Sequence, residues 1–311
     1  MGVASLRSFV ENNRSPKSAS SVLPGGQSTE QLLSVVDGLQ SEVASLNVEV
    51  ELLRRRDDSL NQYMSRVDEE MRLAARLQRD FLPKTLPQLG KTFFHTLFRP
   101  AGYVSGDLYD VMRLDESHVG FYLADAVGHG LPAALLTMFI KNALVTKQIG
   151  PNGYRLLEPS QTMAILNDAL LSANLSHATF ATALYGWIDI RTSRVCFSRG
   201  GHPNPIVLRK DGTIEHIESD GPLLGIFPNE VFCDCTVQLE PGDRFLVFTD
   251  GVEVAYCETE QVDTTLWLRE LQSRKHLPAA QLLQELADRM DANTGSLAPK
   301  DDLTMIAIEV G

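Results

Sequence analysis

Residues 119–130 read Val-Gly-Phe-Tyr-Leu-Ala-Asp-Ala-Val-Gly-His-Gly. The mostly apolar run from Phe121 to Asp125 is typical of a buried strand that ends on a carboxylate. Gly128 and Gly130 predict a turn with unusual backbone angles or a close approach, and a proline at the first turn of a helix follows. A strand that brings an acid to such a corner can build a metal or phosphate site. Taken alone, the stretch is better explained by an Asp that closes the turn.

The composition is that of an ordinary globular protein of 311 residues, with 43% hydrophobic and 22% charged residues. A net charge of -12 argues against nucleic acid or an anionic membrane as a partner, and it suits carboxylates that hold divalent cations. The four cysteines lack Cys-x-x-Cys spacing and are expected to be reduced thiols. Without a membrane-spanning run or an apolar signal core, we expect a cytoplasmic protein.

The first 80 residues divide into two segments. Residues 1–28 contain seven serines and two prolines with little apolar periodicity, which predicts a disordered tail. Residues 29–80 carry apolar heptads with Val at a and Leu at d, as in a parallel two-stranded coiled coil. A lone amphipathic helix packed on its own domain is the alternative, but sustained heptads without proline favour the dimer. The rows are Leu32, Leu39, Leu46, Leu53, Leu60, Val67 and Ala74 at d, and Val36, Val43, Val50, Asp57, Met64, Met71 and Gln78 at a.

Two of these seam positions, Asp57 and Gln78, are polar, and they can fix the register or mark a place where the helices rearrange. From residue 81 to 311 the pattern changes to short strands in antiparallel-looking pairs. It predicts a layered α+β domain and not an alternating βαβ one. Helices are expected at 132–148, 158–175 and 277–291. Strands are expected at 92–98, 107–114, 119–125, 180–189, 194–199, 206–209, 213–217, 231–237, 244–249 and 303–310.

Aspartates recur at comparable positions, each at the end or start of an expected strand beside a loop. They are Asp107, Asp125, Asp250 and Asp301, with Asp302 next to the last. Strand ends from different parts of a sandwich can converge at one rim, where carboxylates without a cation would repel one another. All-oxygen clusters select Mg²⁺, Mn²⁺ or Ca²⁺ and not zinc. A turn or cap role explains any single aspartate best, but the recurrence favours a metal site for the set.

Four motifs in this order resemble those of the PPM metal-dependent protein phosphatases, with the bacterial RsbU/SpoIIE-type branch as the best match. They are Ser-Gly-Asp-Leu-Tyr-Asp (105–110), Asp-Ala-Val-Gly-His-Gly (125–130), Thr-Asp-Gly (249–251) and Asp-Asp-Leu-Thr (301–304). The resemblance covers roughly residues 78–311. It implies a four-layer αββα sandwich, here preceded by the long coiled-coil helix, and the activity of a protein serine/threonine phosphatase.

The resemblance also implies two Mn²⁺ or Mg²⁺ ions. Asp125 would bridge them with help from the carbonyl of Ala126, Asp250 and Asp301 would hold one ion, and Asp107 would act on the other side, directly or through water. A water between two cations can be a hydroxide at neutral pH and would attack the phosphorus of phosphoserine or phosphothreonine. His129 could protonate the leaving hydroxyl, or it could only cap the turn. The roles of Asp301 and Asp302 stay open.

The chain departs from the family pattern in two places. Ser105 stands where the family often has glycine, which fits only if its backbone angles are ordinary. There is no arginine at the spacing that the eukaryotic members use to dock the phosphate, since Arg99 is out of register. His202, in Gly-Gly-His-Pro, is expected to be structural.

The resulting prediction is a homodimeric phosphatase whose coiled coil transmits a signal to the catalytic domain. In this branch the usual substrates resemble phosphorylated STAS-type anti-sigma-factor antagonists. The main alternative is a non-catalytic dimeric scaffold that keeps the fold, although its signature would be the loss of metal-binding acids. A two-metal cyclase or nuclease is a weaker alternative, because a phosphate-cradling loop and a basic surface are absent from the sequence.

Overall fold

The computed structural model describes residues 29–151, 153–175, 180–256, 264–293 and 299–311. The predicted tail, residues 1–28, lies outside these ranges. The chain forms two compact units, Met1–Asp68 and Glu69–Gly311. In the described ranges, no helix combines the length and the apolar character that a bilayer crossing requires.

Helix α2 spans Thr29–Phe81, in agreement with the heptad pattern. In the first unit its heptad residues are exposed in the single chain: the exposed fraction is 55% for Leu39, 52% for Leu46 and 52% for Leu53. Within the described residues, the single chain does not bury this apolar row. Its burial would require a second apolar surface. The pairing of two such helices stays a prediction.

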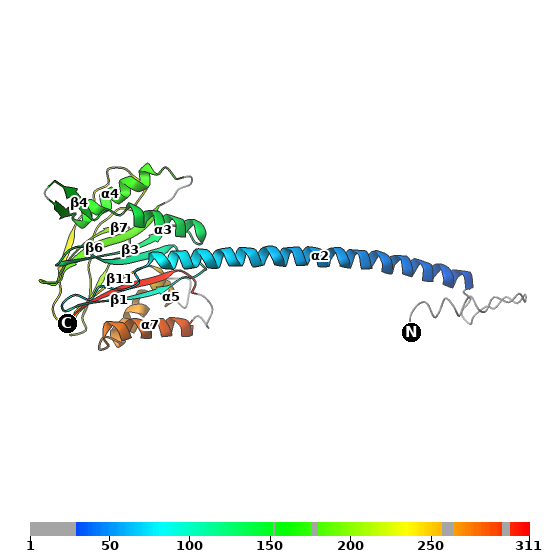
Figure 1. The fold of residues 1–311 in the computed structure, drawn as a ribbon. Helices are drawn as coiled ribbons and strands as arrows, with labels where there is room; N and C mark the ends of the chain where they lie inside the picture. Colours follow the sequence, from blue (N-terminus) through cyan, green and yellow to red (C-terminus); the bar gives the residue numbers. More distant parts are fainter. Residues whose placement is uncertain (1–28, 152, 176–179, 257–263, 294–298) are drawn as a thin grey trace, which may run out of the picture. The chain divides into compact units, whose positions relative to one another are not determined.

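The second unit contains two five-stranded antiparallel sheets in its described residues (Figure 1). The first sheet has the order β1 (Thr92–Arg99), β12 (Leu303–Val310), β11 (Arg244–Phe248), β8 (Ile206–Leu208) and β9 (Ile214–His216). The second has the order β10 (Cys235–Gln238), β7 (Arg194–Gly200), β6 (Ala181–Asp189), β3 (His118–Ala126) and β2 (Asp107–Arg113).

Three apolar layers hold these elements together. Between the sheets, Phe121 and Phe197 both pack against Phe245, with ring centroids 5.9 and 5.6 Å from its centroid. Helices α3 (Leu131–Ala143) and α4 (Pro159–Ser172) cover the second sheet, and α6 (Thr264–Ser273) and α7 (Ala279–Asn293) cover the first. The predicted αββα sandwich is therefore confirmed (Figure 1).

Several element boundaries differ from the prediction. Helix α3 ends at Ala143 and not near 148, because Leu144 adopts an extended conformation. The chain then forms an unforeseen hairpin of β4 (Lys147–Gly150) and β5 (Gly153–Leu156). The ammonium of Lys147 lies 4.7 Å from the centroid of the Tyr154 ring, and this contact joins the two strands.

The short helix α5 (Gly251–Ala255) and helix α6 were also missed, and the strand expected at 231–237 begins only at Cys235. Trp267 of α6 is 1% exposed and packs edge-on against Phe248, with ring centroids 4.7 Å apart. Tertiary burial therefore stabilises a helix whose local signal is short.

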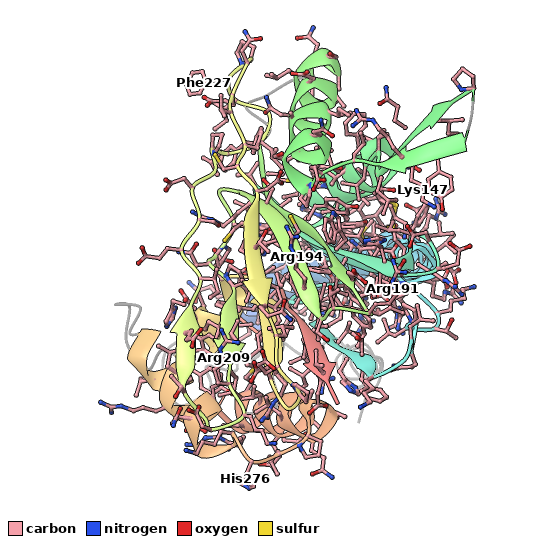
Figure 2. The ribbon with its side chains drawn as sticks, turned by 90° about the vertical axis from the view of Figure 1, so that its left-hand side faces the viewer. Lys147, Arg191, Arg194, Arg209, Phe227 and His276 are labelled. Carbon is pink, nitrogen blue, oxygen red and sulfur yellow. The ribbon has the colours of Figure 1, made fainter. Side chains whose placement is uncertain are left out.

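An ion-pair network closes the far edge of the first sheet, where Arg209 is labelled in Figure 2. Its guanidinium donates to Asp243 at 2.8 Å and to Glu215 at 2.7 Å. Asp243 also accepts the backbone N–H groups of Glu240 and Lys210, each at 2.9 Å. This carboxylate is therefore fully engaged in binding the turn between β10 and β11.

Candidate metal centre

The predicted aspartates gather at one end of the sandwich. Asp107 opens β2 and lies directly opposite Asp125 of β3 in the antiparallel register. Asp250 follows β11 and Asp301 precedes β12, at the end of the first sheet that faces them. Like charges directly opposite each other destabilise a strand pair, so this arrangement needs compensation from nearby groups.

Asp107 is held by two threonines from the other sheet. Its Oδ2 accepts the hydroxyl of Thr304 at 2.6 Å and that of Thr249 at 2.9 Å, and the residue is 1% exposed. Burial and the charge of Asp125 raise the pKa of Asp107, while the two threonine hydroxyls oppose that rise. The Thr-Asp-Gly and Asp-Asp-Leu-Thr motifs thus contribute a threonine each to hold the aspartate of the Ser-Gly-Asp-Leu-Tyr-Asp motif.

Asp125 lies at the centre of the cluster and is half-buried. Burial, together with the charges of Asp250, Asp301 and Asp302, raises its pKa to about 7. Carboxylates act on one another in this way only when they are near neighbours. The structure therefore brings the predicted acids together at one rim, and their role as metal ligands stays a prediction.

Asp301 and Asp302 have different surroundings although they are adjacent in sequence. Asp302 is 7% exposed, and its two carboxylate oxygens accept the backbone N–H groups of Ala101 at 2.7 Å and Gly106 at 2.6 Å. Asp301 is exposed and accepts only the N–H of Asp302, at 2.8 Å, among the hydrogen bonds of the described residues. Burial and the charges of Asp250 and Asp302 raise the pKa of Asp301, while the N–H of Asp302 and, more weakly, His129 oppose the rise.

The loop before Asp107 is tied to the last turns of α2 within the second unit. The side-chain amide of Gln78 donates to the carbonyl of Ser105 at 2.6 Å and accepts its N–H at 2.8 Å. Gln78 is 2% exposed, so it is not available to a seam between two helices, contrary to its predicted place in row a. The helix side that was expected to face a partner is turned inward at this point, where Ala75 is also buried.

Ser105 fits where the family often has glycine. Its φ is not positive, as expected for a tolerated serine. The residue is fully buried, and its hydroxyl accepts the N–H of Asp107 at 3.0 Å. Gly106 must stay small, because a Cβ there would come within 3.3 Å of the Gly128 carbonyl and 3.2 Å of the Ala126 carbonyl. Ala126 in turn donates its N–H to Gly106 at 2.9 Å.

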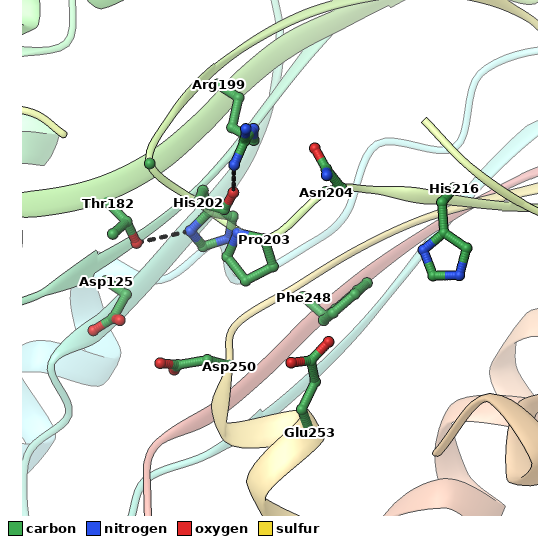
Figure 3. A pocket seen from close by; sticks show the side chains of 11 residues that line it. Asp125, Thr182, Arg199, His202, Pro203, Asn204, His216, Phe248, Asp250 and Glu253 are labelled. Atoms are coloured by element: carbon green, nitrogen blue, oxygen red, sulfur yellow. Dashed lines mark hydrogen bonds between the residues drawn. The ribbon is translucent and has the colours of Figure 1, made fainter. Parts of the chain in front are cut away.

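Two pockets lie on either side of the acids. Asp125 and Asp250 line a pocket of 490 Å³ that is shown in Figure 3. Asp301 and Asp302 line a second pocket of 560 Å³, together with His129. We refer to them as the Asp250-side pocket and the Asp301-side pocket. The N-terminal cap of α3 is Gly130, without a side-chain cap hydrogen bond, so the capping role considered for His129 is not seen.

His202 is structural, as expected. It is fully buried, its Nδ1 lies 3.0 Å from the Thr182 hydroxyl, and its carbonyl accepts the guanidinium of Arg199 (Figure 3). Burial and the charge of Arg199 lower the pKa of His202 to about 3, so the ring is neutral at physiological pH. Arg199 also donates to the carbonyl of Ser219, at 2.9 Å from Nε.

Glu253 is an acid of this site that the motifs did not single out. It lies one turn after Asp250 on α5 and lines the Asp250-side pocket (Figure 3). Burial and the charge of Asp250 raise its pKa. The signal in the sequence is the i, i+3 spacing from Asp250, which puts both side chains on one helix face.

The oxygen-only donor set fits Mg²⁺ or Mn²⁺. In the described part of the chain, no group of three or more His, Cys, Asp or Glu side chains has the geometry to hold a metal ion as it stands. Mg²⁺ usually takes one or two protein carboxylates and keeps several waters, so it does not require a closed protein cage. Cations would also relieve the mutual repulsion that raises the pKa of Asp125.

Comparison with solved structures shows the class of fold. The SiaA-PP2C domain of Pseudomonas aeruginosa superposes with a TM-score of 0.67 at 19% identity, over 80% of this chain and 98% of that domain. The RsbU and RsbW domains of a Mycobacterium tuberculosis protein superpose with a TM-score of 0.58 at 22% identity, over 72% of this chain and 61% of that structure. The fold is therefore that of a PP2C-type domain.

The family follows from the sequence match. The family model described as Stage II sporulation protein E (SpoIIE) matches residues 115–311, and the chain belongs to this family. The phosphoserine phosphatase RsbU of Bacillus subtilis is 29% identical over 195 residues, which are 62% of this chain and 56% of RsbU. Protein IcfG of Synechocystis is 25% identical over 260 residues, which are 77% of this chain and 41% of IcfG. The chain thus spans about half the length of these curated relatives.

Proposed function

We propose that this chain is a metal-dependent protein serine/threonine phosphatase that acts on a bacterial signalling protein. The observation that carries the proposal is the convergence of Asp107, Asp125, Asp250 and Asp301, from four separate motifs, at one rim of a PP2C-type sandwich. The relative RsbU, which is named a phosphoserine phosphatase, supports the same reaction class.

The residues of the site divide into ligands and supports. Asp125, with help from the carbonyl of Ala126, would hold two Mn²⁺ or Mg²⁺ ions together with Asp107, Asp250 and Asp301. When bound, the ions would supply a water of lowered pKa as the nucleophile of phosphomonoester hydrolysis. Asp302 is the support that holds the loop ends at Ala101 and Gly106, and it is not proposed as a ligand.

Metal binding is tested by calorimetric titration with Mn²⁺, alongside phosphate release from para-nitrophenyl phosphate. We expect the unaltered chain to bind Mn²⁺ and to release phosphate only when the ion is present. The matched variant Asp250→Asn should bind Mn²⁺ more weakly. A folded chain that binds no Mn²⁺ and releases no phosphate would instead support the non-catalytic scaffold.

We propose His129 as the proton donor to the leaving group, because it lines the Asp301-side pocket together with Asp301. A phosphoserine needs such a proton, whereas para-nitrophenolate leaves without one. The variant His129→Gln should therefore slow hydrolysis of a phosphoserine peptide by about a hundredfold and affect para-nitrophenyl phosphate far less. Equal losses on both substrates would show that His129 does not donate the proton.

For the substrate we propose a serine-phosphorylated STAS-type protein in the cytoplasm, following the resemblance to the RsbU/SpoIIE branch. The measurement is kcat/KM for phosphate release from such a protein against that for a phosphoserine peptide of the same local sequence. A higher value for the folded protein is expected, because a folded partner can contact more than the reacting residue. Equal values would argue against a dedicated protein substrate.

We further propose a homodimer through the predicted coiled coil of residues 29–80, except at its last turn, where Gln78 faces its own domain. The exposed heptad leucines support it, and replacing Leu39, Leu46 and Leu53 with Ser should convert a dimer to a monomer in analytical ultracentrifugation. A monomer before any substitution would refute the coiled coil.

The Gln78–Ser105 hydrogen bonds offer a route by which the helix could regulate the site. They lie two residues from Asp107. Replacing Gln78 with Met should weaken Mn²⁺ binding and activity several-fold, while Gln62→Met at an exposed position of the same helix should change neither. Equal behaviour of the two variants would leave the helix without influence on the site.

A further inference from the structure

The Asp301-side pocket carries a cation to which neither the motifs nor the proposed metal ligands assign a role. Lys300 precedes Asp301, is exposed, and lines this pocket with His129 and Asp302. Ala101, Gly102 and Val104 form the opposite wall. Hydrogen bonds hold this wall at both ends. Asp302 accepts the N–H of Ala101, at the start of the wall, and that of Gly106, two residues after Val104.

The charge balance of the site calls for such a cation. Six acids of the site, when ionised, carry two negative charges more than two divalent ions neutralise. They are Asp107, Asp125, Asp250, Glu253, Asp301 and Asp302. A phosphomonoester adds about 1.5 to 2 negative charges at neutral pH. The substrate would therefore be repelled by the fully loaded site unless a further positive group meets it at the entrance.

Among the described residues, Arg199 is a second cation near the acids, and it is already engaged. Arg199 lines the Asp250-side pocket, but its guanidinium donates to the carbonyl of His202 (Figure 3) and to that of Ser219. The Asp250-side pocket also contains Glu253, which would repel a phosphate. The Asp301-side pocket contains Lys300 and His129 in place of a further glutamate, so it is the more favourable approach for an anion.

We propose that Lys300 is the phosphoryl-binding residue of this chain, with its ammonium holding the phosphate of the substrate in the Asp301-side pocket beside Asp301. The inference rests on the proposed phosphatase function and adds the residue that receives the substrate. A flexible ammonium can act as a point charge on a phosphate without the fixed geometry that an arginine would need. It would supply the positive charge that no arginine provides at the spacing used by the eukaryotic phosphatases.

The test uses the full chain loaded with Mn²⁺ and inorganic phosphate as the probe. Phosphate affinity is measured by calorimetric titration and by competitive inhibition of para-nitrophenyl phosphate hydrolysis. The variants are Lys300→Ala, Lys300→Gln and Lys300→Arg. The control is Lys91→Ala, because Lys91 is an exposed lysine just before β1, at the end of that strand opposite to Arg99.

We expect Lys300→Ala and Lys300→Gln to weaken phosphate binding about tenfold and to raise KM by a similar factor, as for the loss of one charge-assisted hydrogen bond. Lys300→Arg should retain most of the affinity, and Lys91→Ala should match the unaltered chain. Mn²⁺ affinity should not change in any variant, which separates phosphate binding from damage to the metal site.

Three results would overturn the inference. One is equal phosphate affinity in Lys300→Ala and Lys91→Ala. Another is a loss of phosphate affinity in Lys300→Ala that excess Mn²⁺ reverses, since Lys300 would then act through the metal site. The third is no phosphate binding by the unaltered, Mn²⁺-loaded chain. If that chain binds phosphate through Lys300 but hydrolyses no phosphomonoester, the proposed catalytic function fails while the phosphate site stands.

Discussion

The acids at the rim fall into two groups that the structure holds in different ways. Asp107 and Asp302, the fixed acids, are buried and accept hydrogen bonds from two threonine hydroxyls and from two backbone N–H groups. Asp125, Asp250 and Asp301, which we call the pocket-facing acids, line the two pockets. Asp302 also lines the Asp301-side pocket, but its two backbone donors hold it in place. The protein supplies hydrogen-bond donors to the fixed acids, although burial still raises the pKa of Asp107. The pocket-facing acids depend more on what binds there.

The comparison shows how the fold separates stability from function. A buried carboxylate with hydrogen-bond partners stabilises its surroundings, and removing it leaves donors unsatisfied. A cluster of like charges without such partners costs stability and is retained where a ligand is to be bound. Neighbours in sequence can therefore have opposite effects when they are mutated.

The largest effect is expected at the centre of the pocket-facing group. Asp125→Asn should reduce phosphate release more than about a thousandfold, since it removes the proposed bridging ligand and several kcal/mol of charge stabilisation. The unfolding free energy of the metal-free protein should stay the same or rise, because like-charge repulsion falls. Urea denaturation and a phosphatase assay measure the two effects. A large loss of stability would place Asp125 among the fixed acids.

The adjacent pair Asp301 and Asp302 gives the sharpest contrast. In Asp302→Asn, the amide NH₂ would face one of the two backbone N–H donors, those of Ala101 and Gly106, and would leave that donor without an acceptor. We therefore expect the unfolding free energy to fall by about 2–3 kcal/mol. Asp301→Asn should change the unfolding free energy by less than about 0.5 kcal/mol while it still lowers Mn²⁺ affinity. Equal stability losses in urea denaturation would remove the distinction between the groups.

Removing the hydroxyl of Thr304, one of the two threonines that hold Asp107, should lower the unfolding free energy by less. Thr304→Val keeps the shape of the side chain and deletes the 2.6 Å hydrogen bond to Asp107. A loss of about 1–2 kcal/mol is expected from leaving a buried carboxylate oxygen with one donor fewer. The exposed Thr192→Val, in the turn between β6 and β7, is a suitable control. No difference between the variants in urea denaturation would mean that Thr249 alone holds Asp107.

The smallest effect concerns Asp243, a buried acid away from the rim that, like the fixed acids, accepts several hydrogen bonds. Burial raises its pKa, but the N–H of Glu240 and the guanidinium of Arg209 outweigh burial and lower it below the ordinary value of 3.8. A depressed pKa contributes stability that is present above pH 3.8 and is lost as the pH falls through the folded-state value. The stability difference between the unaltered chain and Asp243→Asn, about 1 kcal/mol, should therefore shrink below pH 3.8. A difference that grows on acidification would contradict this sign.

The sequence determined the α+β class, the long helix and the four acid motifs, because these depend on local spacing. Heptad periodicity predicted a helix over residues 29–80, and α2 ends one residue later, at Phe81. The acid motifs marked the strand ends that meet at the rim. The hairpin of β4 and β5 and helices α5 and α6 were missed, because short elements depend on packing more than on a local pattern.

Only the tertiary structure decided which acid has which surroundings. Asp302 is a fixed acid because Ala101 and Gly106, nearly 200 residues earlier, bring their N–H groups to it. Gln78 leaves the predicted seam because the Ser105 backbone satisfies both ends of its amide. Periodicity along the chain records which side of an element is apolar. The partner of a polar atom is set by segments distant in sequence, and no local pattern contains that information.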